Sequence, residues 1–288
     1  MKPGFHKMSA DDYHRDPAPV PSLSSGIAHT LLAQSPRHAW TRHPRLNPDY
    51  RDENDPKFDL GTVAHAMLLE GNDSGLVVVQ AEDWRTKDAQ QQRAAAWAVR
   101  RPVILAHQEQ PLRAMVGIAK DYLARSELAG ILEDGAAELT GLWQEGKAWC
   151  RIRPDLWSEA HSVILDYKTT TASAEPEQVI RQRVPSYELQ AGLYVRGVKE
   201  ITGQLPRFVY LFQETEPPFA CSLIGLSPAW QALCDQKAQA AITLWTHCMA
   251  TNKWPDYGAR ICWAEPPAWQ LAKWEESENF NLDEVLPK

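Results

Sequence analysis

The sequence predicts a mixed α/β domain, and three observations support this prediction. Runs of β-branched, aliphatic and aromatic residues, typical of buried strands, occur at 163–165 and 208–213. Apolar side chains recur at helical spacing over 58–70 and 228–249, which indicates helices with one buried face. The chain has 288 residues and is 44% hydrophobic, which is enough for one large globular domain.

We expect three regions along the chain. Residues 1–21 are polar and contain closely spaced prolines, so they are expected to form a flexible N-terminal arm. Residues 22–255 are expected to form the single folded domain. Residues 256–288 are expected to be an acidic, loose C-terminal tail. Three tryptophans of this tail either pack back on the domain or meet another subunit: Trp263, Trp269 and Trp274.

Local patterns place the elements of the domain. A serine-capped helix is expected within 22–35, where a Ser-Pro pair ends it. Strands are expected at 137–143 and 148–153, with a hairpin turn at 144–147 between them. A further helix is expected at 185–195.

Composition limits the classes of function. The net charge of −7 counts against a long basic face for nucleic acid, although acids at a metal site add negative charge and basic groups can be confined to a channel. The five cysteines are dispersed without a Cys-x-x-Cys pair, which argues against disulfides and cysteine-bound metals. No apolar run approaches the roughly 18 residues that span a membrane, and the N-terminus has no signal-peptide core. We therefore expect a cytoplasmic protein without a membrane partner.

The strongest candidate site lies in two neighbouring segments, 151–157 and 163–170. Each segment reads as a short strand, and a hairpin of the two would bring Asp155 and Asp166 together. Lys168 lies two residues after Asp166 and therefore points to the same face. Two adjacent carboxylates repel, and a divalent cation such as Mg²⁺ relieves the repulsion. The alternative is a surface hairpin with ordinary salt bridges.

This pattern resembles the metal-binding core of the PD-(D/E)XK nuclease superfamily. Asp155 matches the first acid, Asp166 the second and Lys168 the lysine of that core. The pattern of residues most resembles the RecE-like exodeoxyribonuclease VIII group, which is related in its core to lambda exonuclease. The resemblance implies a restriction-endonuclease-like core, with a central mixed sheet flanked by helices. It also implies metal-dependent hydrolysis of phosphodiester bonds.

Further segments extend the resemblance and imply further site residues. Gly61 and His65 match the Gly-x-x-x-His helix of RecB-type nucleases, and Glu138 lies in a RecE-like Ala-Glu-Leu segment. His65 and Glu138 are expected to ligate the metal or to tune it from a neighbouring position, and the Tyr167 carbonyl is expected to be another oxygen ligand. Mg²⁺ is the expected metal, with Mn²⁺ able to substitute.

The segment after the lysine resembles the Gln-x-x-x-Tyr helix of the same nucleases. Gln190 is expected to orient the attacking water or Lys168. Arginines near the acids are expected either to balance their charge or to bind phosphate. The residues expected to contact DNA are Tyr194, Tyr187, Arg151 and Arg153.

The resemblance thus implies a Mg²⁺-dependent exonuclease that degrades linear double-stranded DNA, 5′ to 3′, in phage-type recombination or DNA repair. It also implies a ring-shaped homo-oligomer and a single-strand annealing protein as partner. Two alternatives remain open. One is a structure-specific or restriction-like endonuclease on the same core, and the other is a DNA-binding module without catalysis.

Overall fold

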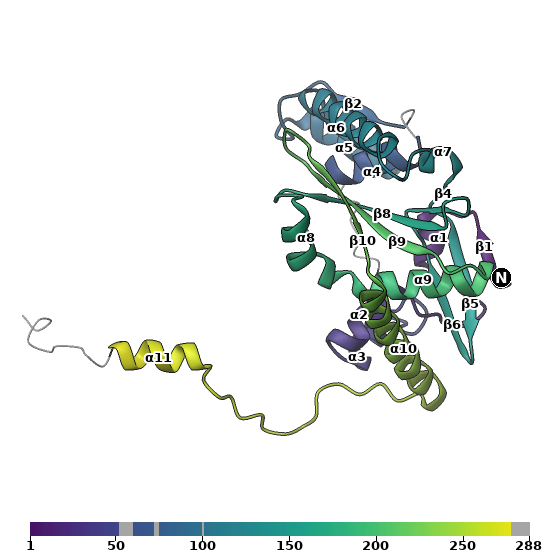
Figure 1. Ribbon diagram of the computed structural model, residues 1–288, viewed down its shortest axis with the longest axis vertical. Helices are drawn as coiled ribbons and strands as arrows, with labels where there is room; N and C mark the ends of the chain where they lie inside the picture. Colours follow the sequence, from purple (N-terminus) through teal and green to yellow (C-terminus); the bar gives the residue numbers. More distant parts are fainter. Residues whose placement is uncertain (52–59, 72–74, 100, 278–288) are drawn as a thin grey trace, which may run out of the picture. The chain divides into compact units, whose positions relative to one another are not determined.

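The computed structural model describes residues 1–51, 60–71, 75–99 and 101–277 of the chain (Figure 1). The chain divides into two units, Met1–Asp256 and Tyr257–Lys288. The second unit carries helix α11 (Ala268–Ser277), and its three indoles at 263, 269 and 274 are 84%, 68% and 67% exposed. Among the residues described, no helix combines the length and the apolar character needed to cross a membrane.

A five-stranded sheet forms the centre of the first unit (Figure 1). Its strands are β4 (Ala136–Ala137), β7 (Leu156–Ser158), β8 (Val163–Thr170), β9 (Arg207–Glu214) and β10 (Cys221–Gly225). Their order is β10-β9-β8-β7-β4, with β8 and β9 parallel and the other neighbours antiparallel. The parallel pair requires a long crossover, which runs through α8 (Pro176–Gln182), the 3-10 turn η1 (Val184–Ser186) and α9 (Glu188–Thr202). The predicted mixed α/β fold, with a central mixed sheet flanked by helices, is confirmed.

Helices cover both faces of this sheet, because its strands are apolar on both faces. The helices are α2 (Ser25–Ala33), α9 and α10 (Pro228–Thr251) on one face, and α4 (Leu60–Leu69) and α6 (Ala106–Ala124) on the other (Figure 1). Side chains alternate along β9: Phe208, Tyr210 and Phe212 join the first core, and Val209 and Leu211 join the second. Polar side chains are few in these strands, so the buried Asp166 in the middle of β8 is an exception that needs a polar partner.

A smaller antiparallel sheet lies at one end of the unit. Its strands are β1 (Gly4–His6), β5 (Thr140–Glu145) and β6 (Ala148–Ile152), in the order β1-β5-β6. The predicted turn between β5 and β6 is present, with Gly146 at φ 57°. The remaining elements are the parallel pair β2 (Val77–Val79) and β3 (Val103–Leu105), with helices α1 (Ala10–His14), α3 (Pro36–Arg42), α5 (Lys87–Ala98) and α7 (Ile131–Asp134).

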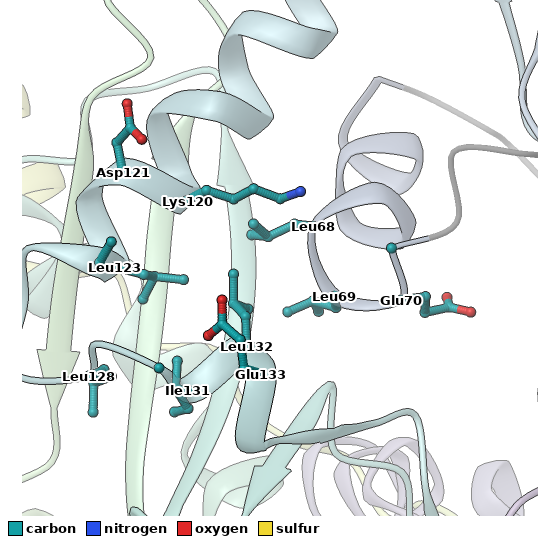
Figure 2. A pocket seen from close by; sticks show the side chains of 13 residues that line it. Leu68, Leu69, Glu70, Lys120, Asp121, Leu123, Leu128, Ile131, Leu132 and Glu133 are labelled. Atoms are coloured by element: carbon teal, nitrogen blue, oxygen red, sulfur yellow. The ribbon is translucent and has the colours of Figure 1, made fainter.

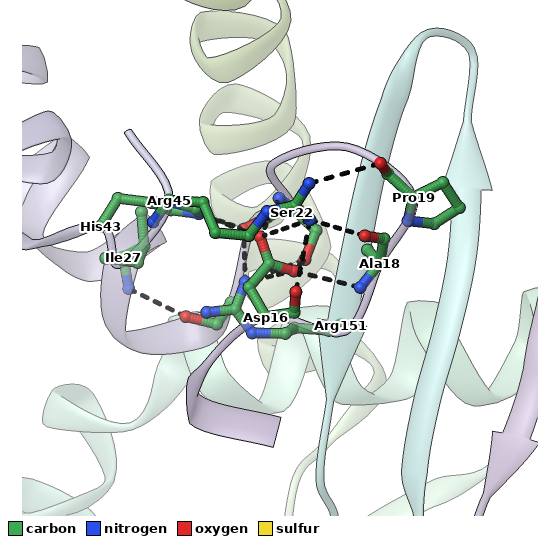
Figure 3. A network of polar contacts seen from close by, with 9 residues as sticks. Asp16, Ala18, Pro19, Ser22, Ile27, His43, Arg45 and Arg151 are labelled. Atoms are coloured by element: carbon green, nitrogen blue, oxygen red, sulfur yellow. Dashed lines mark hydrogen bonds and ion pairs between the residues drawn. The ribbon is translucent and has the colours of Figure 1, made fainter. Parts of the chain in front are cut away.

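The N-terminal segment is packed on the domain, so the loosely ordered arm expected over 1–21 is not what the structure shows. Strand β1 pairs with β5, and Asp16 is buried. The Asp16 carboxylate accepts hydrogen bonds from the Ser22 N–H (2.9 Å) and hydroxyl (2.5 Å) and lies 3.3 Å from Arg151 Nη1 (Figure 3). Burial lowers the pKa of the neighbouring His43 to about 4. One polar residue of the expected arm, Asp16, thus belongs to a buried network whose other members lie later in the chain.

Two of the expected strands are interrupted where the chain passes between the sheets. The strand expected over 137–143 is divided into β4 and β5 at Glu138, whose φ is +56°. The strand expected over 151–157 is divided into β6 and β7, because Pro154 has no N–H to continue a ladder. The Glu138 N–H donates to the Asp155 carbonyl oxygen at 3.1 Å, which joins the two crossing points.

Candidate active site

The β7–β8 hairpin brings the two aspartates together, as expected. Strand β7 begins with Leu156 opposite Leu165, so Asp155 stands beside Asp166, just beyond the last pair. Asp155 Oδ2 accepts a hydrogen bond from the Tyr167 N–H at 2.8 Å. The N–H and C=O of one strand residue point to the same side of the strand. The Tyr167 carbonyl therefore faces the side of β8 on which Asp155 lies, beyond the last backbone pair with β7.

Asp166 carries the clearest sign of a cation site. Its side chain is fully buried, and Oδ2 accepts a hydrogen bond from Gln190 Nε2 at 2.9 Å. Oδ1 contacts the Lys168 ammonium, but among the described residues it has no hydrogen-bond partner of normal geometry. Burial and repulsion from Asp155 raise the pKa of Asp166 to about 6. A buried carboxylate oxygen with unfilled capacity is a good ligand for a hard divalent cation.

His65 and Glu138 complete a cluster around Asp155. His65 Nε2 lies 3.1 Å from Asp155 Oδ2, and His65 Nδ1 lies 3.8 Å from Glu138 Oε1. One potential ligand atom from each of the three lies within 4.8 Å of the other two. Helix α4 brings His65 from one face of the sheet, and α9 brings Gln190 from the other. The three clustered side chains, together with Asp166, suit an oxygen-rich metal site.

Electrostatics link the members of the cluster. Burial acts to lower the pKa of His65, but its hydrogen bond to Asp155 and that carboxylate's charge outweigh burial, so the pKa is raised. Burial acts to raise the pKa of Asp155, but the His65 hydrogen bond and the Lys168 charge outweigh it, so the pKa is lowered. Without a metal, the protonated imidazolium form of His65 is therefore favoured. A metal that bound this ring would have to replace the proton.

Lys168 remains an ammonium group. Burial acts to lower its pKa, but the carboxylates of Asp166 and Asp155 outweigh burial, so the pKa is raised. Its Nζ lies 5.3 Å from the centre of the Tyr187 ring. The structure therefore favours a lysine that orients a water and stabilises charge over one that removes a proton.

The two arginines expected to contact DNA are held by the protein itself. Arg153 Nε donates to Glu138 Oε2 at 2.5 Å, so Arg153 balances an acid of the site. Arg151 is 3% exposed, and its Nη1 donates to the Ser22 carbonyl (2.6 Å) and hydroxyl (2.8 Å). The expected phosphate contact of Arg151 does not fit a guanidinium buried in this way.

The two tyrosines expected to contact DNA differ in their surroundings. Tyr187 is half-buried beside Lys168 and keeps an exposed part. Tyr194 is 6% exposed and packs on Phe208. It lies in the wall of a cavity of about 420 Å³ next to the N-terminus of α2, and not in the cluster of acids.

A larger cavity of about 470 Å³ lies elsewhere, at the C-terminal end of α4 (Figure 2). Leucines of α4 and α6 and the short helix α7 line it, with Lys120 and Glu133 among the charged groups shown in Figure 2. None of the clustered acids lies in its wall. Converging charge, and not cavity size, identifies the candidate site.

Sequence reasoning missed two groups that support the site. Arg153 Nη1 donates to the Met8 carbonyl oxygen at 3.1 Å and to Thr140 Oγ1 at 3.3 Å. The Met8 contact uses a backbone atom from a distant segment, so no side-chain pattern could signal it. Thr140 opens β5 next to the break at Glu138, which only the structure reveals.

A mixed sheet with two acids and a lysine at the end of a central hairpin defines the class of PD-(D/E)XK nuclease folds. Residues 30–264 match the family described as a PDDEXK-like domain of unknown function (DUF3799), and the chain belongs to that family.

Comparison of structures agrees with the fold. The crystal structure of a "Putative exonuclease" from Eubacterium rectale superimposes with a TM-score of 0.55 at 10% identity, covering 92% of this chain and 98% of that one. The crystal structure of SSO0001 gives a TM-score of 0.27 at 13% identity, over 65% of this chain and 87% of that one. This score is too low to indicate a shared fold. A search of curated proteins found no match.

Proposed function

We propose that this protein is a divalent-metal-dependent exodeoxyribonuclease that hydrolyses linear double-stranded DNA from its ends. The observation that carries the proposal is the buried Asp166 carboxylate, which meets Asp155 and Lys168 and keeps one oxygen without a normal hydrogen bond. Family membership supports nuclease chemistry, and the exonuclease name of the Eubacterium rectale protein supports action at ends. The 5′-to-3′ direction, the RecE-like grouping and a role in phage-type recombination or repair rest on the sequence resemblance.

The donors of the cluster suit Mg²⁺, with Mn²⁺ as substitute. Asp155, Asp166, Glu138 and His65, with the Tyr167 carbonyl, would hold the cation. When bound, such a cation would polarise the phosphate and lower the pKa of a neighbouring water, so that this water can lose a proton and attack phosphorus. For His65 to ligate, its ring must first lose the proton that Asp155 favours.

The chain's own groups perform the remaining work. The Lys168 ammonium, held between Asp166 and the Tyr187 ring, stabilises the charge that develops on the phosphate and orients the attacking water. Gln190 fixes the Asp166 carboxylate through Oδ2, so that Oδ1 keeps its direction. Tyr187, half-buried beside Lys168, would be the aromatic residue on which a base of the substrate stacks.

The first experiment compares linear 5′-phosphorylated duplex DNA with a closed circle, with Mg²⁺ or with EDTA. Wild type should degrade only the linear form, and only with Mg²⁺. Lys168→Ala should lower the rate by about 10²–10⁴-fold. Lys147→Ala is the matched control, because Lys147 is an exposed lysine in the β5–β6 turn, and its rate should equal that of wild type.

Other outcomes identify the alternatives. Cutting of the circle would show an endonuclease on the same core. Binding of DNA without cleavage under several divalent metals would show a non-catalytic module. The proposed ring-shaped homo-oligomer and annealing-protein partner are tested separately, by light scattering after gel filtration and by co-purification.

A further inference from the structure

Glu138 is held in an unusual backbone conformation at the edge of the metal cluster. Its φ of +56° lies in the left-handed region, which is sterically unfavourable for an L-residue other than glycine. It stands between β4 and β5, where the chain passes from the large sheet to the small one. The surrounding contacts must therefore hold this residue in place, and its side chain shows how.

The two carboxylate oxygens of Glu138 have different neighbours. Oε2 accepts a hydrogen bond from Arg153 Nε at 2.5 Å. Oε1 lies 3.8 Å from His65 Nδ1, on the side of the cluster that also contains Asp155. One oxygen is thus anchored and the other is presented to the proposed cation.

Arg153 can hold this carboxylate in one direction because its guanidinium is itself fixed. Its Nη1 donates to the Met8 carbonyl oxygen and to Thr140 Oγ1, and its side chain is only 13% exposed. The three partners come from three segments: the N-terminal segment, the break between β4 and β5, and β5 itself. A planar guanidinium can serve them together, whereas a lysine ammonium cannot reproduce the same fork.

We infer that Arg153 is a positioning residue that presents Glu138 to the metal, and that the packed N-terminal segment supports it through the Met8 carbonyl. This inference rests on the proposed metal-dependent function. Groups that orient metal ligands typically change metal affinity by about 10–100-fold when altered. Arg153 itself has no need to touch the cation or the DNA.

The test measures Mn²⁺ binding by calorimetry, without DNA, in the full-length protein. Arg153→Lys should weaken Mn²⁺ binding by about 10–100-fold, and Glu138→Gln should weaken it at least as much. The double variant should bind no more weakly than Glu138→Gln alone, because Arg153 acts through that carboxylate. Losses that add in the double variant, or an unchanged affinity for Arg153→Lys, would overturn the inference.

Arg196→Lys is the matched control. Arg196 is similarly placed, with a side chain 15% exposed and bonded to the carboxylates of Glu145 and Asp235, but it touches none of the proposed ligands. Its Mn²⁺ affinity should equal that of wild type. If Arg153→Lys fails to fold, Thr140→Val removes one partner of the same guanidinium and should weaken binding in the same direction.

DNA cleavage separates positioning from general damage. Because the defect lies in metal affinity, the rate of Arg153→Lys should recover at saturating Mn²⁺, whereas that of Lys168→Ala should not. Absence of recovery would contradict the inference. If wild type binds no Mn²⁺, the proposed function is overturned as well. If wild type binds Mn²⁺ and cleaves DNA, and Arg153→Lys does both equally well, only the positioning role is overturned.

Discussion

Replacing Asp166 by Asn should stabilise the metal-free protein while abolishing metal binding. Burial and repulsion from Asp155 raise the pKa of Asp166 from 3.8 to about 6. Each pKa unit corresponds to about 1.4 kcal/mol, so ionised Asp166 destabilises the metal-free fold by about 3 kcal/mol. Asn has nearly the same shape as the protonated acid and carries no charge, so the variant should avoid most of this cost.

The sign of the pH dependence follows from the same shift. The pKa of Asp166 is higher in the folded protein than in the unfolded chain, so the folded protein binds more protons between about pH 4 and pH 6. Wild-type stability from this group therefore falls as pH rises through that window and is constant above it. The advantage of Asp166→Asn should be near zero at about pH 4 and should reach about 1–3 kcal/mol at about pH 7.5.

Urea unfolding in EDTA at these two pH values measures the effect. Asp155→Asn is the matched control with the opposite sign, because interactions with His65 and Lys168 lower the pKa of Asp155 despite its burial. That variant should be less stable than wild type at the higher pH. Added Mn²⁺ should stabilise wild type but not Asp166→Asn. If Asp166→Asn proved less stable than wild type at about pH 7.5 in EDTA, the electrostatic reasoning would be refuted.

Two further predictions concern packing and support of the site. Gly192→Ala should lower the free energy of unfolding by about 1–3 kcal/mol, because a Cβ there would collide with the Cys234 carbonyl where α9 packs on α10. A Cβ at Gly117 in α6 would have no atom of a neighbouring described element within 4 Å, so Gly117→Ala should instead gain about 0.5–1 kcal/mol. Equal effects of the two substitutions in urea unfolding would contradict the close packing at Gly192. Gln190→Ala should reduce both Mn²⁺ affinity and cleavage about 10-fold or more, because Asp166 Oδ2 loses its donor. Unchanged Mn²⁺ calorimetry would show that Gln190 does not orient the acid.

The sequence was most informative where the local pattern determines the structure. The apolar run before Asp166 has the composition of a buried strand, and strand alternation then placed Lys168 beside that acid. The long helix after Ser227 was predictable because the serine caps it: the Ser227 hydroxyl accepts from the Trp230 N–H. These features need no knowledge of distant contacts.

The sequence was least informative where distant segments meet. The alternation around Glu138 resembled a continuous strand, and nothing local shows that the chain turns there into another sheet. Arg151 looked like a phosphate ligand because it is a cation near the acids, but its partners, Asp16 and Ser22, lie more than a hundred residues earlier. Polar residues and prolines near the N-terminus suggested a loose arm, because nothing local shows that β1 pairs with the distant strand β5 or that Asp16 is buried.

The two crossings between the sheets give metal uptake a second role. Glu138 lies on one crossing and Asp155 beside the other, so a cation held by both would fasten the small sheet to the large one. Part of the binding free energy would then appear as folding free energy. Removal of the ion would then lower the stability of the junction between the two sheets, besides removing the proposed catalysis.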